Sequence, residues 1–140
     1  MTRRHERGVL DTSTVILLSR LGDPEMLPHE PSVTTVTLAE LSVGPLVTDD
    51  PDERAARQAH LQQAEADFDP LPFDAAAARA FGRVAADLRT AGHTTRARAY
   101  DALIAAIAVS QDLPIYTVNP DDFDHVSGLA VVAVPHPDHD

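Results

Sequence analysis

The sequence contains no cysteine and no lysine, and only 4% of its 140 residues are aromatic. Without cysteine the chain has no disulfide, no thiolate metal site and no cysteine nucleophile. No apolar run approaches the ~20 residues of a membrane-spanning helix, so we expect no membrane span. All eleven basic residues are arginine, and 22 acidic residues bring the formal net charge to −11. This charge argues against binding nucleic acid by general electrostatics, although a nuclease can take local positive charge from a metal ion.

The length and composition predict one globular domain over residues 1–140. An apolar content of 44% is enough for a core that needs no covalent cross-link. We expect the polar segments 1–7 and 135–140 to be frayed ends. The expected location is the cytoplasm.

Short apolar strands alternate with helices along the chain. The patterns predict strands at 9–10, 32–38, 113–117 and 130–134, and helices at 12–21, 39–46, 50–66, 74–92 and 97–111. This alternation is typical of an α/β domain, with a central, mostly parallel sheet flanked by helices.

Acidic and amide residues stand where several of these elements meet. Asp11, Glu40 and Asn119 lie at or just beyond the carboxyl end of a predicted strand, and Asp101 lies in the first turn of a predicted helix. Taken singly, Asp11 and Asp101 are most simply explained as helix caps, and Glu40 as a partner of the helix dipole. Because functional sites of such sheets gather at the carboxyl ends of the strands, their joint placement favours a shared site. Carboxylates beside a core are costly unless a cation joins them, which predicts a divalent ion held by oxygen ligands.

Four segments in this order resemble the motifs of PIN domains, and most closely those of the VapC toxins of bacterial toxin–antitoxin modules. The similarity covers roughly residues 8–134, and the segments are Val9–Ser13, Thr35–Leu41, Asp101–Ala106 and Thr117–Phe123. The resemblance implies a PIN-like fold and a Mg²⁺- or Mn²⁺-dependent endoribonuclease toxin that cleaves structured RNA such as transfer or ribosomal RNA. It also implies a homodimer restrained by a VapB-type antitoxin.

By matching positions, the resemblance makes Asp11, Glu40 and Asp101 the metal-binding carboxylates. The fourth catalytic position stays open, because Asn119 stands where other PIN domains often carry aspartate and Asp122 follows three residues later. The number of metal ions, one or two, stays open with it.

Candidate RNA contacts flank these acids. Arg96 and Arg98 precede Asp101 by less than two helical turns and can bind phosphate bidentately. The hydroxyls of Thr12 and Ser13 follow Asp11 and can hold phosphate or water. For the antitoxin we predict a basic segment that offers an arginine to the carboxylates, since a guanidinium fits such clusters.

Three other classes of protein share some of these features. A receiver-type phosphoacceptor domain needs a lysine, which is missing. A haloacid-dehalogenase-like phosphatase needs a second aspartate where Ser13 stands. A PIN-like module that binds RNA or a partner with little catalysis remains open, with Asn119 as its marker.

Overall fold

The fold is built on a parallel sheet. The computed structural model describes residues 4–93 and 96–138, with only the backbone of Arg96 and Ala97. Within this part the sheet has four strands in the order β2-β1-β3-β4, and every neighbouring pair is parallel. The strands are β1 (Arg7–Leu10), β2 (Glu30–Ser32), β3 (Ile115–Thr117) and β4 (Val131–Ala133). The predicted α/β class and mostly parallel sheet are confirmed.

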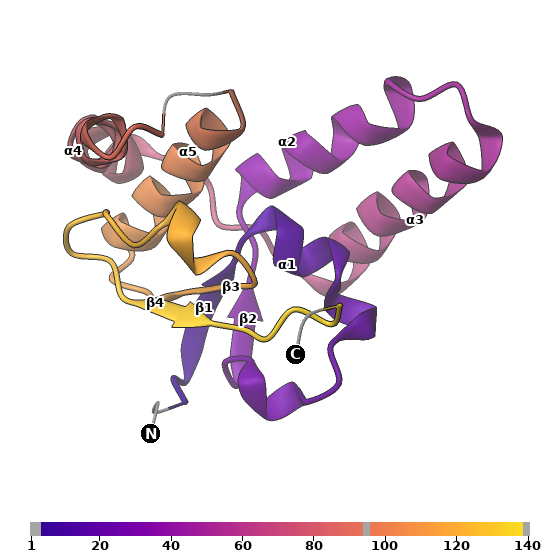
Figure 1. Ribbon diagram of the computed structural model, residues 1–140, viewed down its shortest axis with the longest axis horizontal. Helices are drawn as coiled ribbons and strands as arrows, with labels where there is room; N and C mark the ends of the chain where they lie inside the picture. The colour runs from indigo at the N-terminus through magenta and orange to yellow at the C-terminus, as the bar shows by residue number, and fades with distance from the viewer. Residues whose placement is uncertain (1–3, 94–95, 139–140) are drawn as a thin grey trace.

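Helices cover both faces of this sheet. They are α1 (Thr12–Ile16), α2 (Thr35–Val43), α3 (Pro51–Asp67), α4 (Ala75–Thr90) and α5 (Arg96–Ser110). Short 3₁₀ turns are η1 (Leu18–Arg20), η2 (Pro24–Met26), η3 (Gly44–Leu46) and η4 (Pro120–Asp122). In Figure 1, α4 and α5 lie on one side of the molecule, and the α2–α3 hairpin extends from the other.

The alternation of side chains along the central strands divides the core in two. Val9 and Ile115 are paired neighbours in β1 and β3 and belong to the core under α4 and α5. The next pair, Leu10 and Tyr116, belongs to the core under α1 and α3. Successive residues of a strand point to opposite faces, so two apolar strands serve both cores. The same register brings Asp11, which directly follows β1, beside Thr117, the last residue of β3.

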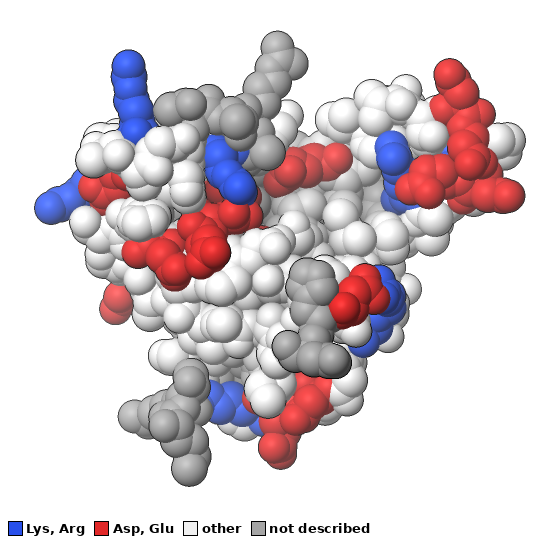
Figure 2. All heavy atoms as spheres, in the orientation of Figure 1, with Lys and Arg blue, Asp and Glu red and all other residues white. Residues whose placement is uncertain are grey.

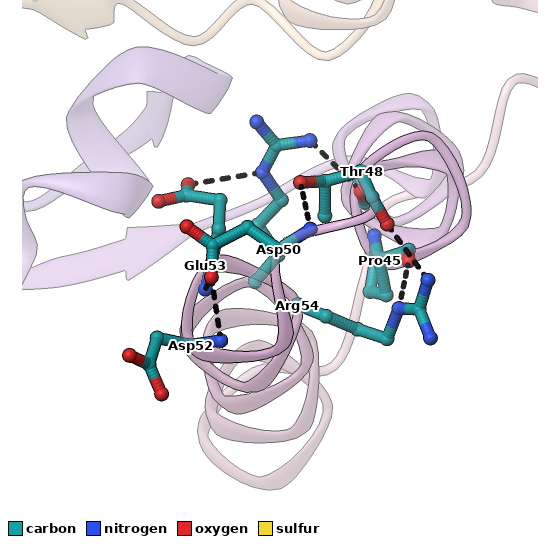
Figure 3. A network of polar contacts seen from close by, with 8 residues as sticks. Pro45, Thr48, Asp50, Asp52, Glu53 and Arg54 are labelled. Carbon is teal, nitrogen blue, oxygen red and sulfur yellow. Dashed lines mark hydrogen bonds and ion pairs between the residues drawn. The ribbon is translucent and has the colours of Figure 1, made fainter.

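Arginines of α3 fix the α2–α3 hairpin (Figure 3). Asp50 caps α3 by accepting from the backbone N–H of Asp52 at 2.9 Å. Arg54 donates to the carbonyls of Pro45 at 3.1 Å and Thr48 at 2.8 Å. Arg57 donates to the carbonyl of Gly44 at 2.9 Å. These bonds satisfy carbonyl groups of η3 and of the loop that follows it, and so fix the connection between α2 and α3.

The predicted strand at 32–38 is wrong beyond Ser32. The hydroxyl of Thr34 accepts from the backbone N–H of Thr37 at 3.2 Å and caps α2, which already begins at Thr35. Capping therefore overrides the strand preference of this β-branched run. Glu40 consequently lies in the second turn of α2 rather than at the end of a strand. Asp101 likewise lies in the second turn of α5, since no acidic residue occupies the described first turn.

Both ends of the described chain make contacts. β1 begins at Arg7, inside the segment expected to fray, and the backbone N–H of His5 donates to the Tyr116 hydroxyl at 3.0 Å. Near the other end, Asp138 pairs with Arg20. Across the described residues, none of the helices has the length and apolarity that crossing a bilayer requires.

Candidate active site

Asp11 is the most deeply buried acid of the candidate site, with 2% of its surface exposed. It follows β1 directly and caps α1 by accepting from the backbone N–H of Thr14 at 3.3 Å. The Thr14 hydroxyl donates to Oδ1 of the same carboxylate, and the Thr117 hydroxyl donates to Oδ2 at 3.0 Å. Both carboxylate oxygens therefore accept hydrogen bonds although the group is shielded from water.

The same two hydroxyls are oriented by the backbone beyond β3. The N–H of Val118 donates to Thr14 Oγ1 at 3.1 Å, and the N–H of Asn119 donates to Thr117 Oγ1 at 2.9 Å. A hydroxyl that accepts from a backbone N–H is free to donate only in another direction, here to Asp11. Two short relays thus run from the end of β3 to the carboxylate and fix its position.

A third relay holds Glu40. The Thr12 hydroxyl donates to Glu40 Oε1 at 2.6 Å and lies 3.0 Å from the hydroxyl of buried Thr37. Because the Thr12 proton is used toward Glu40, the Thr37 hydroxyl is the donor in the second contact. Glu40 and Thr37 both belong to α2, so this network joins α1 to α2 at the site.

Asp101 and Asp122 share one guanidinium. Arg98 Nη1 lies 3.1 Å from Asp101 Oδ2 and 2.5 Å from Asp122 Oδ1. The two carboxylate side chains are only 15% and 17% exposed. Arg98 stands three residues before Asp101 on α5, one helical turn away, whereas Asp122 comes from η4 after β3. The arginine therefore ties two segments together in front of the sheet edge.

The pKa values of these acids reflect burial and mutual repulsion. Burial raises the pKa of Asp101 to about 7, with Asp122 and Asp11 adding repulsion and Arg98 opposing it. Burial also raises the pKa of Asp11, against the hydrogen bonds from Thr14 and Thr117, and Asp122 adds to the rise. The pKa of Glu40 is raised by burial and by Asp11, while Thr12 lowers it. Asp11, Glu40, Asp101 and Asp122 thus form one electrostatically coupled group.

The predicted site residues differ in where they lie relative to the coupled acids. Asn119 is exposed and contributes a backbone N–H to the site, while Asp122 is the acid coupled to Asp11 and Asp101. Thr12 holds Glu40. Ser13 is half-buried on α1, and the side chain of Arg96 lies outside the described residues. Arg98 faces the protein's own carboxylates.

Sequence reasoning missed the buried hydroxyls of Thr14 and Thr37. Thr14 follows Asp11 by three residues, the spacing of a cap and its partner, so a local signal existed for it. No local signal marked Thr37, because its role depends on the packing of α2 against α1.

The acids lie at a hollow of the surface. Figure 2 shows acidic side chains in and beside the depression between the α4–α5 part and the α2–α3 part, next to arginine atoms. The donors are hard oxygens, the kind that Mg²⁺ and Mn²⁺ take. In this conformation, though, no three aspartate, glutamate or histidine side chains of the described residues already lie close enough to hold one ion. Arg98 stands as the cation between Asp101 and Asp122.

Comparison with known proteins gives one consistent family. Residues 9–129 match the PIN domain family. The chain is 42% identical to Ribonuclease VapC5 of Mycobacterium tuberculosis over 129 residues, which are 91% of this chain and 93% of that protein. It is 34% identical to Ribonuclease VapC4 of the same organism over 117 residues, 82% of this chain and 88% of the relative.

A solved structure matches the whole architecture. This is a member of the VapBC family of toxin–antitoxin systems, VapBC-5 from Mycobacterium tuberculosis. The TM-score is 0.77 at 39% sequence identity, over 92% of this chain and 99% of that chain.

Proposed function

Because this chain belongs to the PIN domain family and to the VapC ribonucleases within it, we propose that it is a metal-dependent endoribonuclease toxin of a VapBC module. Its reaction is the hydrolysis of phosphodiester bonds in structured RNA. The ribonuclease assignment rests on relatives that match nearly the full length of the chain. The metal dependence rests on the chemistry of the site.

One observation carries the chemistry: four carboxylates gather at the carboxyl edge of the sheet with a single bridging arginine among them. Burial raises the pKa values of Asp11, Glu40 and Asp101, so each would be stabilised by an added cation. Carboxylate oxygens suit Mg²⁺ or Mn²⁺. Asp11, Glu40 and Asp101 would hold the ion, and Asp122 would serve as the fourth acid. When bound, the ion supplies Lewis acidity and neutralises charge on the phosphate.

Other steps of the proposed reaction are assigned to side chains of the protein itself. The Thr14 and Thr117 hydroxyls keep Asp11 in place and favour its charged form against the effect of burial, since they donate to its two oxygens. Glu40 accepts from Thr12 through Oε1 only, and among the described residues its Oε2 accepts no hydrogen bond. With its pKa raised by burial, Glu40 is suited to take a proton from the attacking water at Oε2.

Partners follow from the charge and the family. The solved structure similar to this chain is a VapBC complex, which supports a VapB-type antitoxin as partner. A basic antitoxin segment that offers an arginine to Asp11 and Glu40 would complement the acids that Arg98 does not pair. We further propose a homodimer that acts in the cytoplasm on transfer or ribosomal RNA.

The alternative is a PIN-like module that binds RNA or a partner with little catalysis. The bridging position of Arg98 and the lack of a preassembled three-ligand group among the described residues favour it. The burial of several coupled acids opposes it, since a binding surface gains nothing from carboxylates held at a cost.

Cleavage of total RNA decides between the two readings. Antitoxin-free protein is incubated with RNA in Mg²⁺, in Mn²⁺ and in chelator, beside Asp11→Asn and Asp101→Asn variants. Exposed Asp49→Asn serves as the matched control for the loss of one charge. Discrete fragments that need metal, vanish in both site variants and persist in the control support the enzyme. Folded protein that cuts nothing in either metal would leave the binding module.

A further inference from the structure

A pocket beside the acids has no role in the function proposed so far. It has a volume of about 350 Å³ and lies between α4 and α5. Its floor is apolar and comes from Phe81, Ala85, Leu88 and Ala102. Leu88 and Ala102 are buried in the core, which gives the floor a rigid support. The size is within the range of about 300–1,000 Å³ that small-ligand sites take.

The rim of this pocket is basic. It is formed by Arg89, His93 and Arg98. The backbone of His93 is fixed by the end of α4, where its N–H donates to the Leu88 carbonyl at 2.8 Å and Gly92 takes a φ of +85°. Arg89 is exposed, and its side chain makes no ion pair or hydrogen bond with any described residue. Within the described part of the chain, Arg89 is therefore a cation that no acidic side chain pairs, on a protein with a net charge of −11.

Arg98 connects the pocket to the coupled acids. The residue lines the pocket, and its Nη1 bridges Asp101 and Asp122. The pocket and the carboxylates are therefore separated by one side chain. Arg54 and Arg57, by contrast, donate to backbone carbonyls of the α2–α3 hairpin. The combination of an apolar floor and a basic rim beside the acids is thus a local feature.

We propose that this α4–α5 pocket binds one nucleotide of the RNA strand next to the bond that is cut. The base lies against the apolar floor with Phe81 as its aromatic contact, and the adjoining phosphate lies on the Arg89 side of the rim. Unstacked bases bind aromatic side chains in single-stranded RNA recognition, and guanidinium groups bind phosphate bidentately. The inference rests on the proposed ribonuclease function, whose RNA would enter the hollow through this pocket.

RNA binding without cleavage tests the proposal. An Asp11→Asn background is titrated with a fluorescein-labelled RNA stem-loop that carries a ten-nucleotide loop, and binding is read by fluorescence anisotropy. Arg89→Gln removes the free rim cation, and Phe81→Leu keeps most of the volume but removes the aromatic face. Arg79→Gln is the matched control, because Arg79 is exposed on the same helix and does not line the pocket.

We expect Arg89→Gln and Phe81→Leu to weaken binding by about tenfold each, since a base stack or a charge-assisted phosphate contact is of that order. Arg79→Gln should change it less than about twofold. Cross-linking of 4-thiouridine-containing RNA to protein with an unaltered pocket should map to α4 and α5, which keeps the test valid if Phe81→Leu fails to fold.

Equal effects of Arg89→Gln and Arg79→Gln, with cross-links outside α4 and α5, would overturn the pocket and leave only general electrostatics. A changed oligomeric state of the pocket variants in light scattering would overturn it too, because the surface would then be a contact between two copies of the chain. Loss of the cleavage activity itself is a separate result. If the wild-type protein cuts no RNA, the proposed function is contradicted. If the wild-type protein cuts RNA and the pocket variants bind RNA as tightly as the protein with an unaltered pocket, only this inference is contradicted.

Discussion

Replacing Asp101 with asparagine is expected to stabilise the metal-free protein at pH 8. Burial and the neighbouring acids raise the pKa of Asp101 from 3.8 to about 7. A rise of roughly 3 units, at about 1.4 kcal/mol per unit, means that holding this carboxylate charged costs about 4 kcal/mol at most. This pKa already includes the favourable contact with Arg98, and asparagine reproduces the neutral carboxyl group only in part, so we expect a net gain of ~2 kcal/mol. For a chain of this size that is roughly 4–10 °C in Tm.

The pH dependence has a definite sign. The folded protein holds the Asp101 proton more tightly than the unfolded chain does, so this contribution to stability is complete below about pH 4. It is lost as the pH rises through about 7, where the folded-state carboxyl ionises. The raised pKa values of Asp11 and Glu40 act in the same direction. In chelator the wild-type protein should therefore lose stability between pH 5 and pH 8, and Asp101→Asn should lose less.

Urea unfolding in chelator at pH 5, 6, 7 and 8 measures this effect. Wild type, Asp101→Asn and Asp49→Asn are compared, since Asp49 is exposed and, among the described residues, neither caps a helix nor forms an ion pair. The difference between wild type and Asp101→Asn should grow with pH, while the control follows wild type. A wild-type stability that is flat or rising between pH 5 and pH 8, or an Asp101→Asn protein that is less stable at pH 8, would refute the account of burial and repulsion.

Other variants test the remaining parts of the site. Asp122→Asn should lower Mn²⁺ affinity by about 10–100-fold in calorimetry, as loss of a supporting carboxylate does. Asn119→Ala should change this affinity by less than about twofold. Equal effects of the two substitutions would contradict the assignment of Asp122 as the fourth acid. Thr14→Val should destabilise the protein by ~2 kcal/mol in urea, because the Val118 N–H loses its acceptor and Asp11 Oδ1 keeps only the Thr14 backbone N–H as a donor. Thr14→Ser should restore most of this stability. Arg98→Met should lower Tm in chelator, since Asp101 and Asp122 then lack their shared cation, yet Mn²⁺ should raise its Tm by more than it raises that of wild type. A smaller metal-induced rise in Arg98→Met would show that the arginine does not compete with the ion.

Much of the fold could be predicted from the sequence, because its signals are local. The caps at Asp50 and Asp74 began α3 and α4 where expected, and the apolar runs gave β3 and β4 within two residues. The alternation of strands and helices was enough for a parallel sheet with helices on both faces. The start of α2 was not predictable in this way, because Val33–Leu38 has strand-forming residues and only the Thr34 cap makes Thr35 the first residue of a helix.

The sequence by itself was also enough to identify the family, since four ordered acidic motifs carry the resemblance, and to predict which acids form the candidate site. Only the tertiary structure shows how Asn119 and Asp122 differ in their surroundings, because Asn119 is exposed whereas Asp122 pairs with Arg98. The same holds for the Thr14 and Thr117 relays, which need the register of β1 beside β3, and for the direction of Arg98. These features depend on where side chains from distant segments meet, and that is set by packing and register rather than by any local pattern of residues.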